Sequence, residues 1–287
     1  MSIGIVTDTA CDLPLTTLFE QGIAFVNHEL VVDGQRKRDW RDVDPPLLYR
    51  ILERSEILPQ LLAPDKDDFK KVYIRFLSQH EHIISIHVAS QMSKTLKNAH
   101  QARNELKAEN RITIIDSKTI NVALAEMVLE ANKLAKDGAP KDHILWSIEH
   151  ILGSSSLYFS PDSIKWLARR RESNSSKIVE SFQNQRPIFK LSHGKTERVA
   201  TVSGAQINAN ISNSLKADFQ DKPVHIALSY AGDNRVEIDR AKHSLELSGL
   251  DIIQGRAQIM GSLLGIMLGP KSISIYAHKA LSASLKI

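Results

Sequence analysis

The sequence predicts an α/β protein whose amino-terminal half contains a largely parallel β-sheet. Three short apolar runs each end in polar residues, as buried strands that run into turns do: Ile3 to Thr7, Ile83 to Val88 and Arg111 to Ile115. Apolar residues at helical spacing occupy the stretches around these runs, at Asp67 to Gln79, Ser93 to Lys107 and Asn121 to Lys136. Strands that alternate with helices are typical of a parallel sheet flanked by helices.

Polar residues at the ends of these runs are expected to gather along one edge of the sheet. The carboxyl ends of parallel strands meet there, and ligands bind where the strand order reverses. Asp8, Ser90 and Asp116 are therefore predicted to face one crevice, with Thr7 and Ser117 beside them. Each of these residues could instead serve only as a turn former or a helix cap.

A second domain is predicted after a glycine- and serine-rich segment at residues 153–156. This segment places the boundary between an amino-terminal α/β domain, 1–152, and a carboxyl-terminal α/β domain, 153–287. A helix is expected before it at Lys141 to Leu152. Beyond it we expect strands at Leu157 to Phe159, Pro187 to Leu191, Val224 to Tyr230 and Ser272 to His278, and helices at Pro161 to Arg170, Ser203 to Leu215 and Asn234 to Leu247.

Composition excludes several classes of protein. Of the 287 residues, 42% are hydrophobic, which is enough for a sizeable core. The sequence contains no uncharged apolar run of about 18 residues, the length that a membrane span needs. The single cysteine, Cys11, excludes an internal disulfide and a cysteine-based metal cage and fits the reducing cytoplasm, so we expect a cytoplasmic protein. Neither a metal nor a cofactor is expected. The net charge is only +4 and aromatic residues are scarce, which argues against nucleic-acid binding.

The opening segment Val6-Thr7-Asp8-Thr9-Ala10-Cys11-Asp12-Leu13-Pro14 resembles the signature of the DegV family, VTDSTADLP. Two further blocks are similar to family elements in order and spacing: Ser90-Gln91-Met92-Ser93-Lys94-Thr95 and Ile115-Asp116-Ser117-Lys118. The segments at Arg186-Pro187-Ile188 and from Gly265 to Gly269-Pro270 also resemble family elements, so the resemblance spans nearly the whole chain.

The resemblance implies a two-domain bacterial fatty-acid-binding protein rather than an enzyme. In the family, an apolar tunnel holds the acyl chain, the carboxylate reaches a crevice between the domains, and a separate fatty acid kinase phosphorylates the bound acid. Carried onto this sequence, the resemblance places Ser93, Thr95 and Ser90 at the carboxylate, while Asp8 and Asp116 shape the crevice floor. Burial of a hydrocarbon chain at about 0.8 kcal/mol per methylene is a sound physical basis for such a carrier.

This sequence departs from the family pattern at the expected head-group site. Leu61 and Leu62 stand where the family has a hydroxyl pair, and Met267 replaces a histidine. Three cations, Lys94, Arg171 and Lys271, are candidate anion contacts that could replace the lost hydroxyls. The alternative hypothesis is therefore a binding or regulatory module that keeps the scaffold and recognises another anionic metabolite or a protein partner.

Two catalytic or metal-binding interpretations are weaker. A hydrolase would need Asp8, His87 and one of Ser90 or Ser93 to act together, but the chain lacks a G-x-S-x-G nucleophile turn. His80 and His82, which flank Glu81, could form part of a metal site, but the sequence offers no obvious third ligand. We therefore interpret them as ordinary surface residues.

Overall fold

A computed structural model describes residues 2–163, 166–167 and 185–280 of the chain. Its contacts divide the chain into two compact units. The first contains Met1–Asp44 and Pro59–Gly153, and the second contains Pro45–Leu58 and Ser154–Ile287. The inclusion of 45–58 in the second unit was not expected from the sequence. That two domains separated between residues 152 and 153 fold independently stays a prediction.

The first unit is built on a fully parallel four-stranded sheet with the order β2-β1-β6-β7. Its strands are β1 (Ile3–Asp8), β2 (Ala24–Val26), β6 (His82–His87) and β7 (Ile112–Asp116). The three predicted strands form within one residue of their expected bounds. Strand β2 was missed because three residues are too short for a periodic signal. The strand order reverses between β1 and β6, so this sheet has its switch point there.

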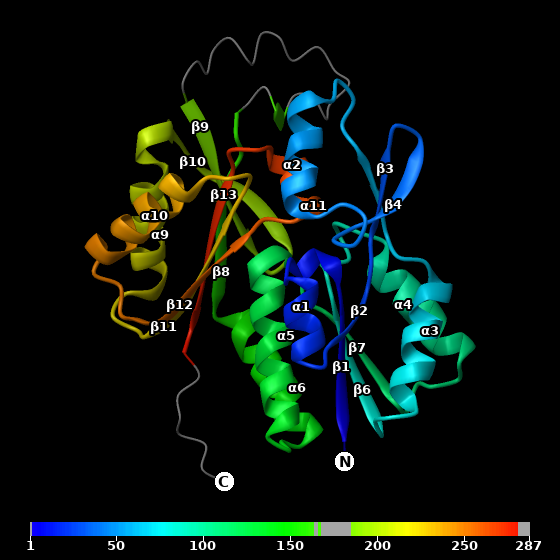
Figure 1. The fold of residues 1–287 in the computed structure, drawn as a ribbon. Coiled ribbons are helices and arrows are strands. Elements are labelled where there is room, and N and C mark those ends of the chain that lie inside the picture. The colour runs from blue at the N-terminus through cyan, green and yellow to red at the C-terminus, as the bar shows by residue number, and fades with distance from the viewer. Residues whose placement is uncertain (1, 164–165, 168–184, 281–287) are drawn as a thin grey trace. The chain divides into compact units, whose positions relative to one another are not determined.

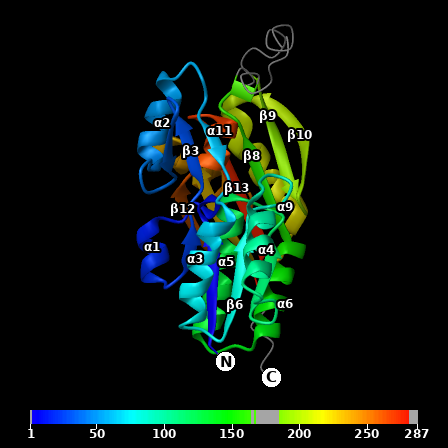
Figure 2. The same ribbon diagram turned by 90° about the vertical axis from the view of Figure 1, so that its right-hand side faces the viewer.

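Helices cover both faces of this sheet (Figures 1 and 2). On one face, α3 (Lys66–Leu77) packs against β2 and β6, and α4 (Thr95–Glu105) packs against β7. The other face is covered by α5 (Asn121–Lys136), which packs against β1 and β6, and α6 (Lys141–Gly153) packs on α5. The short α1 (Leu15–Glu20) contacts β2. Under α3 and α4, Val6, Phe69 and Ile83 belong to one buried apolar cluster.

A small antiparallel sheet, which the sequence analysis did not predict, completes the first unit. Its order is β4-β3-β5, with β3 (Glu29–Val32), β4 (Gln35–Arg38) and β5 (Gln60–Leu62). Leu61 pairs with Leu30 and Leu62 with Glu29. Leu61 and Leu62, which stand where the family has a hydroxyl pair, therefore lie on an edge strand. This strand ends immediately before the turn that leads to α3.

The second unit contains a six-stranded mixed sheet with the order β10-β9-β8-β13-β11-β12. The strands are β8 (Ser155–Ser160), β9 (Gln185–Ser192), β10 (Lys195–Ser203), β11 (Val224–Tyr230), β12 (Ile252–Ile259) and β13 (Ile273–Lys279). Its helices within the described residues are α2 (Pro45–Arg54), α9 (Ile207–Phe219), α10 (Arg235–Leu247) and α11 (Ser262–Leu268). All four predicted strands and the helices at α9 and α10 are present, whereas half of the predicted helix at 161–170 lies outside the described residues.

Helix α2 belongs to the second unit because its apolar face is buried there. Leu48, Tyr49 and Leu52 are buried, and α2 packs against α11. The hydroxyl of Tyr49 donates a hydrogen bond of 2.9 Å to the carbonyl of Met260. These contacts join residues 211 positions apart in sequence, which explains why a linear division of the chain misses them. None of the helices in the described segments has the length and apolar character needed to cross a bilayer.

Candidate functional site at the carboxyl ends of β1 and β6

Asp8 lies at the switch point of the parallel sheet and is fully buried. Its Oδ1 accepts a hydrogen bond from the Ala10 N–H at 3.0 Å and so caps the turn that follows β1. Its Oδ2 accepts from the Val88 N–H at 3.1 Å and from Nδ1 of His87 at 2.9 Å. The carboxylate thus fastens the end of β1 to the end of β6, and none of its surface is exposed to a ligand.

The ionised form of Asp8 is favoured despite this burial. Burial by itself raises the pKa of a carboxyl group. Here the hydrogen bond from His87, the nearby imidazoles of His28 and His87, and the Val88 N–H outweigh burial, so the pKa of Asp8 lies below its usual value. Because an ionised carboxylate can only accept, the Nδ1 of His87 must donate to it.

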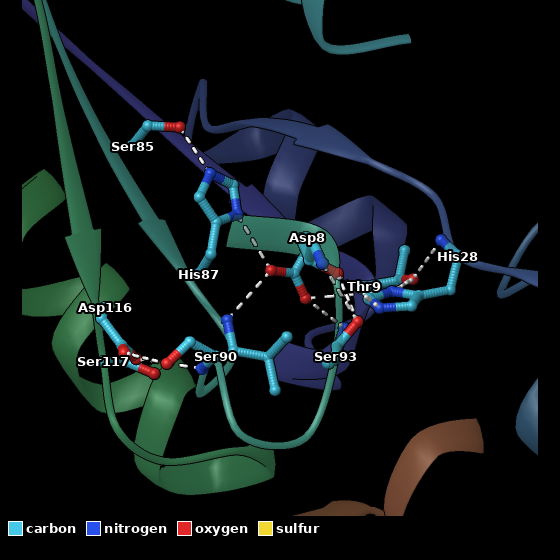
Figure 3. Close-up of polar contacts among 12 residues, drawn as sticks. Asp8, Thr9, His28, Ser85, His87, Ser90, Ser93, Asp116 and Ser117 are labelled. Atoms are coloured by element: carbon cyan, nitrogen blue, oxygen red, sulfur yellow. Dashed lines mark hydrogen bonds and ion pairs between the residues drawn. The ribbon is translucent and has the colours of Figure 1, made fainter. Parts of the chain in front are cut away.

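A buried polar chain continues from His87 away from the strand ends (Figure 3). Its Nε2 lies 2.6 Å from the hydroxyl of Ser85, which in turn lies 2.9 Å from the hydroxyl of Tyr73. Asp8, His87 and Ser85 therefore have the connectivity of a Ser-His-Asp triad. Ser85 is fully buried, however, so its hydroxyl has no path to a substrate. The serines considered with this histidine from sequence, Ser90 and Ser93, form no hydrogen bond with it within the described residues.

His28 is a site residue that the sequence analysis missed. It follows β2, is almost fully buried, and its backbone N–H donates to the hydroxyl of Thr9 at 3.0 Å. Its Nδ1 lies 3.2 Å from the same hydroxyl, and its Nε2 lies 3.2 Å from the hydroxyl of Thr95. Burial lowers the pKa of His28 below its usual value, and the neighbouring Asp8 only partly offsets this effect. The one sequence signal was a histidine in a short polar stretch, Asn27 to Glu29, between two apolar runs.

Ser93 and Thr95 meet at the start of α4, as the sequence analysis placed them. Their hydroxyls are 2.7 Å apart, and Ser93 also accepts from the Thr95 N–H at 3.3 Å. Thr95 is fully buried against His28, whereas Ser93 is half-buried. The first backbone N–H groups of an α-helix lack intrahelical partners and carry partial positive charge. A half-buried hydroxyl at such a helix start is suited to an anionic group.

Ser90 and Asp116 form a separate cluster, as Figure 3 shows. The Ser90 hydroxyl donates to Oδ2 of Asp116 at 2.6 Å, and Oδ1 of Asp116 accepts from the Lys118 N–H at 2.9 Å. Ser117 is buried and donates instead to the Thr119 carbonyl at 3.2 Å. The predicted crevice residues therefore divide into a buried group around Asp8 and a separate pair formed by the exposed Ser90 and the half-buried Asp116.

The remaining predicted site residues occupy different environments. Thr7 is buried, and its hydroxyl has no hydrogen-bond partner within the described residues. Lys94 is exposed directly before α4, and Lys271 is exposed in the second unit. Met267 is half-buried in α11, and Leu61 and Leu62 are half-buried on β5. Arg171 lies outside the described residues. Within the described segments, no three His, Cys, Asp or Glu side chains are grouped closely enough to hold a metal ion.

Comparisons with known proteins agree with the signature segments. Residues 2–280 match the model of a family described as "Uncharacterised protein, DegV family". The chain belongs to the DegV family. A DegV domain-containing protein from Deinococcus radiodurans is 25% identical over 294 residues, covering 99% of this chain and 100% of that protein.

Two solved structures share the fold. One, from Thermus thermophilus and described as showing fatty acid binding, has a TM-score of 0.87 at 23% identity, covering 98% of this chain and 100% of its own. The other, a stearic-acid-binding protein from Eubacterium ventriosum, has a TM-score of 0.82 at 16% identity, covering 96% and 98%. These likenesses confirm the predicted two-domain α/β DegV fold.

Proposed function

We propose that this DegV-family chain binds a long-chain fatty acid and presents its carboxylate to a partner fatty acid kinase. The observation that carries the proposal is the position of Ser93: a half-buried hydroxyl at the start of α4, beside the switch point of a parallel sheet, backed by a buried hydrogen-bond chain. Related DegV-family proteins are described as binding fatty acids, including stearic acid. In this role the chain supplies solubility and orientation, and the kinase supplies nucleotide and chemistry.

The hydrogen-bond chain behind Ser93 has a preferred direction when an anion is bound. The Thr9 hydroxyl already accepts from the His28 backbone, so its own proton is available to Nδ1 of His28. A neutral His28 with the proton on Nε2 then donates to Thr95, and Thr95 donates to Ser93. In that arrangement the Ser93 proton points outward and is free for a carboxylate. The opposite tautomer would make Ser93 present lone pairs, which repel an anion.

The acyl chain requires an apolar tunnel, and we infer that the fold provides one, as the family resemblance implies. Each buried methylene contributes about 0.8 kcal/mol, so a C16 tail supplies most of the binding free energy. The head group mainly fixes orientation. Leu61 and Leu62 cannot donate hydrogen bonds to the carboxylate. Each hydrogen bond to a charged group that is lost in this way reduces the binding free energy by about 1.5–3 kcal/mol.

Native mass spectrometry of delipidated protein refed with palmitate tests the proposal. We expect a one-to-one complex, and Ser93→Ala should weaken it about tenfold, which corresponds to about 1.4 kcal/mol. The matched control is Ser214→Ala, which deletes a hydroxyl that donates only to the Asn210 carbonyl in α9. Protein that stays ligand-free with fatty acids of several lengths would exclude the carrier function.

A second candidate function, recognition of another anionic head group, is favoured by Lys94. Its side chain is exposed next to Ser93 and has no ion-pair partner within the described residues. Such a cation suits a phosphate at the same helix start. This function would be favoured over the first if the chain binds hexadecyl phosphate more tightly than palmitate and if Lys94→Gln abolishes that preference.

The kinase partner is tested separately with purified fatty acid kinase and ATP. Acyl phosphate formed on the loaded protein can be trapped with hydroxylamine. We expect a hydroxamate only when kinase, ATP and the palmitate-loaded chain are combined.

A further inference from the structure

A concave apolar cavity lies in the first unit along the β2 edge of the parallel sheet. It has a volume of about 670 Å³, within the range of about 300–1,000 Å³ typical of small-molecule pockets. Its lining runs from the first residues of β1 to Phe25, which pairs with Thr7, and to Asn27, the neighbour of His28. None of Asp8, His28, Ser93 and Thr95 lines it, so the cavity is distinct from the polar site at the strand ends.

The walls of this cavity suit a ring or a short alkyl group. Phe19, Phe25 and Phe76 line it together with aliphatic residues of β1, β2 and α3. Phe19 is 68% exposed, and its ring meets that of Phe25 edge-to-face at 5.5 Å. Strand β2 forms the edge of its sheet, since it pairs only with β1 in the described part of the chain. Large apolar side chains that remain accessible in a concave site point to an apolar ligand.

The charges around the cavity have a single sign. Among the described residues that line it there is no aspartate or glutamate, whereas Arg75 and Lys136 are both present. Lys136 donates only to the neutral side chain of Gln21, at 2.9 Å. The guanidinium of Arg75 has no ion-pair partner within the described residues, although three lysines of the same helix, Lys66, Lys70 and Lys71, are each paired with a carboxylate. An anion would complement these two unneutralised cations.

Gly4 has a specific role in shaping the cavity wall. A Cβ atom at this position would lie 2.6 Å from the ring of His80 and 2.9 Å from that of Phe76. The absence of a side chain lets both rings lie over β1, where they line the cavity. The Nδ1 of His80 is buried without a hydrogen-bond partner in the described segments, which leaves one polar atom of the lining unsatisfied.

We propose that this cavity is a second binding site, which takes an amphipathic organic monoanion. The apolar body lies among Phe19, Phe25 and Phe76, and the carboxylate pairs with Arg75 and Lys136. This inference does not depend on fatty-acid binding at Ser93, because neither Ser93 nor the residues of its hydrogen-bond chain, Thr95 and His28, line the cavity.

The test uses 1-naphthoate as the probe, titrated into the full chain with and without saturating palmitate. Amide chemical shifts in ¹H–¹⁵N spectra report where it binds. We expect saturable shifts at Ala24, Phe25 and Arg75 in both titrations. We also expect 1-naphthylmethylammonium, which has a similar body and the opposite charge, to bind at least tenfold more weakly.

Three variants sharpen this test. Arg75→Glu should weaken 1-naphthoate binding at least tenfold, and Ala135→Leu, which fills the lining from α5, should do the same without a charge change. Lys195→Glu makes the same change in charge at an exposed position of the second unit and should leave binding unchanged. Equal affinity for the two probes, retained binding in Arg75→Glu, or complete displacement by palmitate would overturn the proposal. Concentration-dependent dimerisation that occludes the cavity would overturn it as well.

Discussion

The Nδ1 atom of His87 lies 2.9 Å from Oδ2 of Asp8, and neither side chain is exposed to solvent. This contact joins the carboxyl ends of β1 and β6, where the order of the parallel sheet reverses. Figure 3 shows that Thr9, His28 and Ser93 gather at the same end of the sheet. The polar network therefore has two roles that experiments can separate: it fastens two strands together, and it orients the Ser93 hydroxyl.

Asp8→Asn should destabilise the fold by about 1–3 kcal/mol. Asp8 accepts three hydrogen bonds through two oxygens, whereas an amide offers only one accepting oxygen, so a buried donor loses its partner. Urea unfolding with an unchanged m-value measures the loss. Asp33→Asn is the matched control: this exposed turn residue has a φ of 51°, which Asn tolerates, and the change should stay within about 0.5 kcal/mol. Equal effects of the two substitutions would contradict the role assigned to Asp8.

His28→Gln should make stability less sensitive to mild acid. The pKa of His28 in the folded protein lies below the value of 6.5 expected for the unfolded chain. The unfolded state therefore binds more protons as the pH falls below 6.5, and stability declines. The lowered pKa of Asp8 adds a further loss only when the pH falls below 3.8. Urea unfolding between pH 7.5 and 5 should show a smaller decline for His28→Gln than for the native chain.

Other histidines that remain in the His28→Gln variant limit how much its acid-induced loss of stability differs from that of the native chain. Burial also lowers the pKa values of His80, His82 and His100, so part of the decline persists. Identical declines in the two proteins would mean that His28 is already protonated in the folded state.

Thr95→Val and Ser93→Ala should differ in their effects on stability. Thr95 is fully buried and bridges His28 and Ser93, so the nearly isosteric valine leaves Nε2 of His28 unpaired at a cost of about 1–3 kcal/mol. Ser93 is half-buried, and water can replace its contact with Thr95. Thermal unfolding of both variants checks this difference. A larger loss of stability in Ser93→Ala would show that Ser93 is the structural residue of the pair.

The double variant Leu61→Thr with Leu62→Ser should bind palmitate about tenfold more tightly. It restores the hydroxyl pair that the family resemblance places at the carboxylate, and one hydrogen bond to a charged group contributes about 1.5–3 kcal/mol. The turn after β5 lies beside α4, because the Asn98 side chain donates to the Pro64 carbonyl at 2.7 Å. Competition against a fluorescent fatty acid measures the change. Unchanged affinity would place the head group away from β5.

Gly269→Ala should destabilise the protein more than Gly138→Ala does. Both glycines have positive φ angles, 94° and 75°, so alanine is strained at either position. A Cβ at Gly269 would also lie 2.6 Å from the indole of Trp166, whereas nothing lies within 4 Å of one at Gly138. The difference between the two losses, measured by urea unfolding, combines the close packing on Trp166 with the backbone strain at φ 94° and ψ 175°, a conformation that essentially only glycine adopts. Equal losses would contradict both effects.

The sequence by itself determined the elements that repeat a local pattern. Helix α5 spans the predicted 121–136, and β11 spans the predicted 224–230, because each has its own periodicity and its own stop signals. The sequence also placed Ser93 and Thr95 near the start of one helix, since it predicts a helix at Ser93 to Lys107. Elements of three or four residues, such as β2, β3 and β5, lack any such local signal.

Only the tertiary structure decided which distant side chains complete the site. His28 reaches Thr95 across 67 positions, and His87 reaches Asp8 across 79. The grouping of α2 with the second unit and the cavity beside Phe25 likewise arise from contacts between remote segments. Such contacts form because strand order and helix packing bring together segments that are far apart along the chain. Local propensity and periodicity carry no information about either.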